Sequence, residues 1–134
     1  MITVRGLGIR LGAFAFQNLD LSISDGEYLV LLGPTGVGKT VLVETLAGLQ
    51  RPAAGRIVLD GVDVTCLPPE ARGLGFVPQD YALFPHLSVQ ENIAFGLQMR
   101  GQDRQQQAAR VRDIANRLGI DSLLDRSVRR LSGG

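Results

Sequence analysis

The chain has 134 residues, 45% of them hydrophobic, with 14 basic and 13 acidic residues and a formal net charge of +1. That length suits one ordinary domain with a sizeable core, and the near balance of charge argues against a nucleic-acid partner. No apolar run approaches the roughly 20 residues of a membrane-spanning helix. Arg5 and Arg10 interrupt the first apolar residues, whereas a signal peptide has an uninterrupted apolar segment. We therefore expect a cytosolic location.

Short apolar runs alternate with turn residues over positions 2–32, which predicts β structure. Asp25-Gly26 is typical of a hairpin turn. The continuous apolar run at 28–32 predicts a buried strand, and a glycine-rich loop follows it directly. Beyond the loop, apolar residues at helical spacing predict a helix that ends at Gly48, before Pro52.

Later elements are indicated mainly by their turn and capping residues. Asp60-Gly61 lies between two apolar runs, 56–59 and 62–64, and predicts a two-residue hairpin. Residues 74–77 predict a strand that Pro78 stops. The run from Ser88 to Glu91 fits a capping box, so a helix should begin there. Residues 103–118 predict an amphipathic helix closed by Gly119, and a further helix should cover part of 121–131.

The glycine-rich loop matches the phosphate-binding pattern G-x-x-x-x-G-K-[ST]. Its glycines let successive backbone N–H groups curve around an anion, and the following helix directs its N-terminus at the same anion. Lys39 would bridge the terminal phosphates, and Thr40 would offer a hydroxyl to Mg²⁺. Lys39 is the only lysine beside 13 arginines, and a compact ammonium reaches between phosphates as a guanidinium does not. The sequence therefore predicts ATP and Mg²⁺ as cofactors, the alternative being a plain turn between a strand and a helix.

Two further motifs follow in a fixed order. One is Val77-Pro78-Gln79, and the other is the ending Leu131-Ser132-Gly133-Gly134. With the glycine loop, they resemble the Q-loop and the start of the signature motif of ATP-binding cassette (ABC) transporter ATPases, and the resemblance covers the whole chain. It implies an α/β fold: a P-loop NTPase core with an N-terminal antiparallel β subdomain and an incomplete helical subdomain. We expect the core and β subdomain at 1–79, and the helical subdomain, truncated at the signature motif, at 80–134.

The resemblance also implies roles for individual positions. Gln79 would reach the γ-phosphate and Mg²⁺; otherwise it is a polar residue at a strand end. The region from Tyr81 to His86 would contact membrane-spanning permease subunits, or else pack within its own subdomain. A second ABC subunit would pair head to tail, so that the signature residues contact its nucleotide; otherwise they form a serine-glycine turn. The implied nucleotide contacts are Gly33, Pro34, Thr35, Gly36, Val37, Gly38, Lys39, Thr40, Val41, Ser132, Gly133 and Gly134, with Thr40 and Gln79 as Mg²⁺ ligands.

Three departures from the family pattern affect these expectations. Leu11 stands where an aromatic residue usually stacks on adenine; Phe14 or Phe16 could substitute, although a core role is the alternative for each. Val41 replaces a common hydroxyl residue, so its contact would come from the backbone. The Walker B strand with its catalytic glutamate, and the switch histidine, do not occur before position 134. This leaves Gln79 as the one catalytic candidate and predicts that this chain alone is inactive as an ATPase.

Within the family, the loop region and the run from Leu67 to His86 most resemble molybdate/tungstate importer ATPases, although sulfate, iron(III), polyamine and sugar importers share much of this sequence. The implied function is an ATP-binding importer subunit that couples ATP binding and hydrolysis to solute transport, peripheral on the inner face of the cell membrane. Alternatives are a non-transport ABC protein, another P-loop class such as a nucleotide kinase, and an inactive nucleotide-binding fragment.

Overall fold

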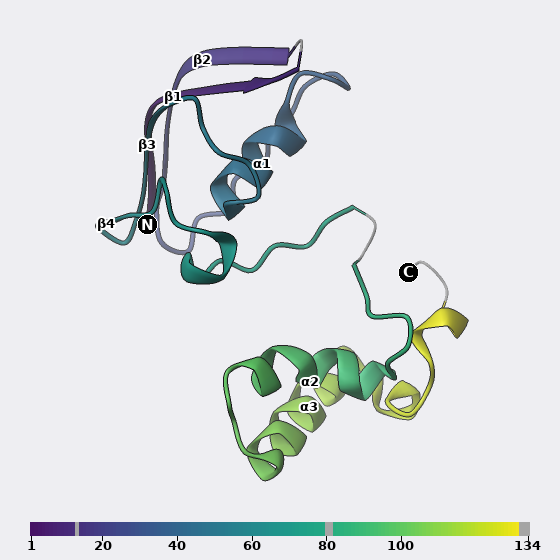
Figure 1. Ribbon diagram of the computed structural model, residues 1–134. Coiled ribbons are helices and arrows are strands. Elements are labelled where there is room, and N and C mark those ends of the chain that lie inside the picture. Colours follow the sequence, from purple (N-terminus) through teal and green to yellow (C-terminus); the bar gives the residue numbers. More distant parts are fainter. Residues whose placement is uncertain (13, 80–81, 132–134) are drawn as a thin grey trace. The chain divides into compact units, whose positions relative to one another are not determined.

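A computed structural model describes residues 1–12, 14–79 and 82–131 of the chain (Figure 1). The chain divides into two compact units, Met1–Phe76 and Val77–Gly134. Among the described residues, the first unit holds a sheet, one α-helix and one short 3₁₀ helix, and the second holds two α-helices and two short 3₁₀ helices. The order of β structure followed by helices agrees with the sequence prediction.

The sheet of the first unit is entirely antiparallel, with the strand order β2-β1-β3-β4. The strands are β1 (Ile2–Leu11), β2 (Phe14–Ile23), β3 (Ala54–Leu59) and β4 (Val62–Asp63). The predicted hairpin at Asp60-Gly61 is confirmed, because both residues have positive φ angles, 48° and 83°, and Leu59 pairs with Val62 across the turn.

A bulge in β1 places the core residues on one face. The pairing of β1 with β2 shifts between Val4 and Leu7, where Gly6 has a φ of 55°. On the other side, a Cβ on Gly55 would lie 2.5 Å from the carbonyl oxygen of Gly6, so only glycine fits there. The shift lets Val4, Leu7 and Ile9 all be buried, at 0%, 0% and 3% exposure.

Helix α1 (Lys39–Ala47) covers this buried face of the sheet (Figure 1). Leu42 joins the core cluster, which otherwise consists of sheet and loop residues: Val4, Leu7, Ile9, Ile57, Leu59 and Val64. Gly48 ends the helix with a φ of 89°, as the sequence predicted.

A buried arginine closes the far end of α1. Arg72 directly follows the short helix η1 (Pro69–Ala71) and is only 7% exposed. Its guanidinium donates to the carbonyl oxygens of Thr45 (2.8 Å) and Leu46 (3.0 Å) in α1, and to those of Leu67 (2.9 Å) and Thr65 (3.1 Å). Burial lowers the pKa of Arg72 from its ordinary value. Arg72 thus adds a donor to the Thr45 carbonyl, which also accepts from the Gly48 N–H at 3.2 Å, and satisfies the Leu46 carbonyl at the helix end.

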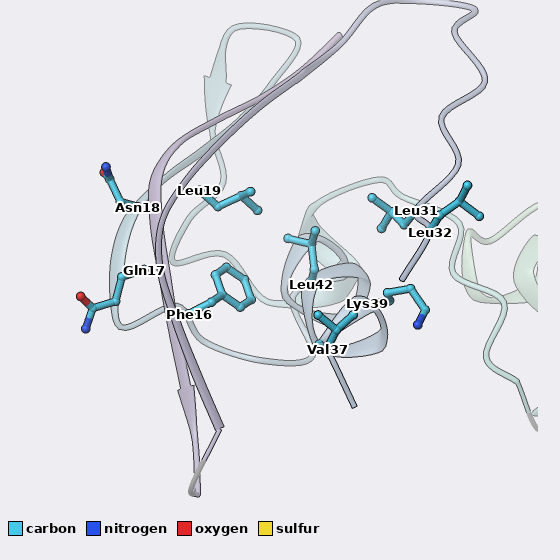
Figure 2. A pocket seen from close by; sticks show the side chains of 10 residues that line it. Phe16, Gln17, Asn18, Leu19, Leu31, Leu32, Val37, Lys39 and Leu42 are labelled. Carbon is cyan, nitrogen blue, oxygen red and sulfur yellow. The ribbon is translucent and has the colours of Figure 1, made fainter. Parts of the chain in front are cut away.

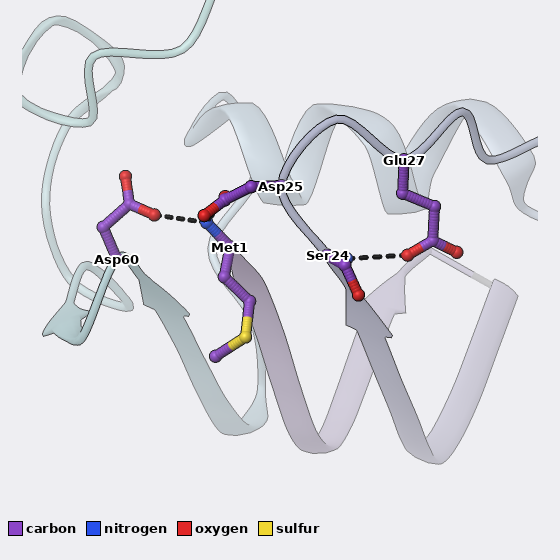
Figure 3. Close-up of polar contacts among 5 residues, drawn as sticks. All are labelled: Met1, Ser24, Asp25, Glu27 and Asp60. Carbon is purple, nitrogen blue, oxygen red and sulfur yellow. Dashed lines mark hydrogen bonds and ion pairs between the residues drawn. The ribbon is translucent and has the colours of Figure 1, made fainter.

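The start of β1 is held by acidic side chains. The N-terminal ammonium of Met1 contacts the carboxylates of Asp25 and Asp60 (Figure 3). Hydrogen bonds with Asp25, and then with Asp60, raise the pKa of this amino group. In the same picture, the Ser24 N–H donates to the Glu27 carboxylate at 2.7 Å. These contacts connect the turns that follow β2 and β3.

Two predicted strands are wrong. Residues 28–32 and 74–77 have no regular secondary structure and pair with no described strand. Tyr28 and Leu32 are 91% and 87% exposed instead of buried. Asp25-Gly26 does form a turn, but no strand follows to complete a hairpin. A strand depends on hydrogen bonds to a neighbouring strand, and an apolar run does not reveal whether that neighbour is present.

The second unit contains α2 (Val89–Met99) and α3 (Arg104–Leu118), and both starts match the prediction. Gly119 ends α3 with a φ of 67°. The helix expected within 121–131 is only partly confirmed, because the chain forms two 3₁₀ turns there, η2 (Asp121–Leu123) and η3 (Val128–Arg130). In the part of the chain that the structure describes, no helix combines the length and the apolar character needed to cross a membrane.

Candidate nucleotide-binding site

The glycine loop at 33–40 runs directly into α1. Gly36 and Gly38 have φ angles of 87° and 96°, in the left-handed region that side chains disfavour. The N–H of Val37 donates to the carbonyl of Pro34 at 3.4 Å, and that of Leu42 donates to Gly38 at 2.9 Å as the first helical bond. The glycines therefore sit where the backbone must turn to start the helix.

The N-terminus of α1 has no side-chain cap among the described residues. Gly38 is the N-cap residue and brings no side-chain oxygen, and the first turn contains no acidic residue. The first N–H groups of a helix lack partners inside the helix, and they carry the positive end of its dipole. This end of α1 therefore suits an anion such as a phosphate.

Lys39 places its charge over the same loop. Its ammonium donates to the carbonyl oxygens of Gly33 (2.7 Å) and Pro34 (2.8 Å), and both hydrogen bonds are exposed to solvent. Because the ammonium has three donors, a phosphate oxygen can bind the remaining donor or displace a carbonyl. The lysine singled out by the sequence is thus held beside the uncapped helix.

Thr40 and Val41 differ in what they offer to a ligand. Thr40 is exposed, whereas Val41 packs partly buried against the core cluster, so only its backbone faces a ligand. Across the described residues, no cluster of three or more His, Cys, Asp or Glu side chains could hold a metal. Mg²⁺ often keeps several waters and binds substrate phosphates, so one hydroxyl beside a phosphate loop fits this ion.

An apolar cavity of about 290 Å³ lies beside the loop (Figure 2). Phe16 and Leu19 from β2 face Leu42 of α1 across it, whereas Gln17 and Asn18 project from the opposite side of the strand. Its full lining is Phe16, Gln17, Asn18, Leu19, Leu31, Leu32, Val37, Gly38, Lys39 and Leu42. Most of this lining is apolar and suits hydrocarbon. Gly38 and Lys39, at the uncapped helix end, are the part of the lining that suits an anion.

The aromatic residues near the loop occupy different surroundings. Phe16 packs against the core cluster. Its ring meets that of Phe14 edge to face, with centroids 6.0 Å apart and planes at 74°. Leu11, at the position where an aromatic was expected, is 45% exposed. Sequence reasoning missed two features here: the buried Arg72 at the end of α1, and a close contact between Phe14 and Gly38.

One residue of the predicted permease-contact region, Phe84, is held on α2. Tyr81 lies outside the described residues, but Phe84 is fixed because its N–H donates to the Asn92 side-chain oxygen at 2.8 Å. The Asn92 amide donates back to the Phe84 carbonyl at 3.1 Å. The rings of Phe84 and Phe95 lie 4.2 Å apart.

The other predicted site residues belong to the second unit or lie outside the described residues. Gln79 is exposed and belongs to the second unit. Ser132, Gly133 and Gly134 lie outside the described residues. The assembled part of the candidate site is therefore the loop at 33–40 with the start of α1.

Comparison with known proteins gives a consistent result. The family model described as ABC transporter matches residues 16–134. The chain is 56% identical over 125 residues to a molybdate/tungstate import ATP-binding protein of Archaeoglobus fulgidus, covering 93% of this chain and 50% of that protein. It is 47% identical over 134 residues to the protein so named in Pyrococcus abyssi, covering 100% of this chain and 39% of the relative.

A further relative is named for a different transported solute. An sn-glycerol-3-phosphate import ATP-binding protein of Escherichia coli is 48% identical over 116 residues, with 87% of this chain and 33% of that protein covered. Among solved structures, a dimeric ATP-binding cassette in a post-hydrolysis state bound to ADP and Pi aligns with a TM-score of 0.84 at 22% identity. That alignment covers 99% of this chain and 64% of the other. The chain thus has the fold of such cassettes and spans half or less of the curated relatives' length.

Proposed function

Because the chain belongs to the ABC transporter family, we propose that it binds ATP with Mg²⁺ as part of the ATP-binding subunit of an importer. The observation that carries the proposal is the uncapped start of α1 with the Lys39 ammonium held over the loop at 33–40. A triphosphate would receive backbone N–H groups, the positive end of a helix and one cation together.

In this proposal each loop residue has a separate task. The backbone N–H groups from Gly36 to Val41 would surround the β-phosphate, and the Lys39 ammonium would move from the Gly33 and Pro34 carbonyls to the terminal phosphates. The Thr40 hydroxyl would orient Mg²⁺, which neutralises phosphate charge.

We propose that Gln79 contacts the γ-phosphate and Mg²⁺. Alignment of the attacking water commonly uses an acidic side chain in addition to these clamps, and none of the residues proposed to contact the nucleotide is acidic. We therefore assign ATP binding to these 134 residues and expect no steady turnover from them alone.

The partners and cargo follow from the relatives. We propose a permease as the partner of the region from Tyr81 to His86, and a second ABC subunit whose nucleotide would meet Ser132, Gly133 and Gly134. The relatives at 46–56% identity over 93–100% of the chain are named for molybdate/tungstate import, which supports an oxyanion as the transported solute. Such a subunit would work on the inner face of the cell membrane.

The test is a titration of the chain with Mg-ATP. Lys39→Ala should weaken binding at least about tenfold, because a hydrogen bond to a charged group contributes about 1.5–3 kcal/mol. Arg51→Ala is the matched control, since it removes an exposed cation from the same unit, and it should leave the affinity unchanged. Thr40→Ala should remove most of the benefit that Mg²⁺ gives to ATP binding. A folded chain whose affinity does not depend on Lys39 would disprove the proposal.

A further inference from the structure

The ring of Phe14 touches the phosphate loop at its last glycine. A Cβ placed on Gly38 would lie 2.2 Å from Cζ of Phe14, and 2.9 Å and 3.1 Å from its Cε1 and Cε2 atoms. Real Cβ atoms essentially never approach other atoms this closely. The tip of the ring therefore occupies the space that any side chain at position 38 would need.

The Phe14 ring contacts Phe16 on one side and Gly38, at the start of α1, on the other. Phe16 packs against the core cluster and meets Phe14 edge to face. Gly38 is the N-cap of α1, has a φ of 96°, and directly precedes Lys39. A contact at Gly38 therefore affects both the helix N–H groups and the backbone that carries the lysine.

A ring that serves as a platform for a nucleobase presents its face to the base. Here the atom of Phe14 nearest to Gly38 is Cζ, at the ring tip, so the ring abuts the loop end-on. We propose that Phe14 is a positioning residue for the phosphate loop, holding Gly38 and thereby Lys39 in place, rather than a stacking residue for adenine. The inference rests on the proposed function, because it concerns the same phosphate site.

The consequence is that Phe14 should matter equally for ligands with and without a base. The chain is titrated with Mg-ATP and with magnesium and inorganic tripolyphosphate. Phe14→Ala should weaken both about three- to tenfold, with the ratio of the two affinities unchanged within about twofold. Phe14→Leu should recover most of the loss for both, because leucine fills space without a π-face. Ser22→Ala truncates an exposed side chain of the same strand, β2, as the control and should change neither.

A second readout needs no ligand. In ¹⁵N–¹H spectra of the ligand-free chain, Phe14→Leu should move the amide signals of Gly38 and Lys39, while Ser22→Ala should not. This readout also decides the question if Phe14→Ala does not fold.

Three results would overturn the inference: a loss for ATP but not for tripolyphosphate, unchanged affinities in Phe14→Ala, or unmoved loop amides in Phe14→Leu. Each leaves the proposed function standing if wild-type binding depends on Lys39. If the wild-type chain binds neither ligand, the proposed function and the inference fail together.

Discussion

The N-termini of α1 and α2 are built in opposite ways. At α2, the Ser88 hydroxyl accepts from the Glu91 N–H at 3.2 Å, and the Glu91 carboxylate accepts from the Ser88 N–H at 2.7 Å. The N–H of Val89 donates to the carbonyl of Arg126 at 3.0 Å. At α1, by contrast, the described residues supply no capping side chain and no acid in the first turn.

The difference separates a helix start that stabilises the fold from one that is available to a ligand. The N–H groups of α2 are satisfied within the protein, whereas α1 leaves its own to solvent or an anion. Helix α1 is instead stabilised at its other end by Arg72. Changes to the closed ends should therefore affect stability, and changes to the open end should affect nucleotide affinity.

The largest expected effect comes from Arg72→Leu. Among the described residues, the change leaves the half-buried carbonyls of Leu46 and Leu67 without donors, at about 1–3 kcal/mol each, so we expect a loss of about 2–6 kcal/mol in the free energy of unfolding. The Thr45 carbonyl keeps the N–H of Gly48 at 3.2 Å. Urea unfolding of the chain measures it. Arg51→Leu, at an exposed position nearby, is the control and should stay within about 0.5 kcal/mol. Equal effects of the two changes would show that Arg72 does not support α1.

Gly38→Ala should damage stability and binding together. The left-handed φ costs about 1–2 kcal/mol for a residue with a Cβ, and the collision with Phe14 adds about 1–3 kcal/mol. Gly101→Ala is a matched control, because Gly101 has a φ of 69° but no atom within 4 Å of its added Cβ. It should show the conformational cost alone and leave Mg-ATP affinity unchanged. Equal losses of Mg-ATP affinity in Gly38→Ala and Gly101→Ala would contradict a specific role of the α1 start in binding.

Ser88→Ala should act on stability alone. Loss of an N-cap hydroxyl costs about 1 kcal/mol, and this cap belongs to α2 rather than to the phosphate loop. Thermal unfolding measures the loss of stability, and an ATP titration of the same sample measures the affinity, which should not change. Ser122→Ala, at an exposed position, is the control. A drop in ATP affinity would mean that the two helix starts are not independent.

The smallest effect is a pH dependence at the same cap. Hydrogen bonds from the backbone and then the side chain of Ser88 lower the pKa of Glu91 from its ordinary value of 4.5. A carboxylate with a lowered folded pKa stabilises the protein above its unfolded pKa, and the benefit is lost as pH falls through the folded pKa. Urea midpoints of the wild type should therefore fall faster below about pH 4.5 than those of Glu91→Gln. Parallel plots of urea midpoint against pH for the wild type and Glu91→Gln would contradict a stabilising role of the Glu91 carboxylate.

The sequence predicted the features that depend on local chemistry. Asp60-Gly61 needs positive φ angles, Ser88 and Glu91 form their capping box within four residues, and Gly48 ends α1; all three are confirmed. The position of the loop before α1 is confirmed for the same reason, since glycines and a helix start are adjacent in the chain.

Features that depend on distant neighbours were not predictable in the same way. The apolar runs at 28–32 and 74–77 indicated strands, but strand pairing requires partners that a local pattern does not specify. Arg72 looks like a surface residue by type, and only the fold shows that four carbonyls surround it. Phe14 offered a π-face in the sequence, whereas its contact with Gly38 arises because β2 passes beside the loop.

The most direct test of the difference between the helix starts is an amide-resolved titration of the chain with Mg-ATP. In ¹⁵N–¹H spectra, the amides from Gly36 to Val41 should move with saturating shifts, and the move should vanish in Lys39→Ala. The amides of Val89 and Gln90 at α2, which already donate to protein carbonyls, should stay in place. Shifts centred on the start of α2, or none at the loop in a folded chain, would contradict the account.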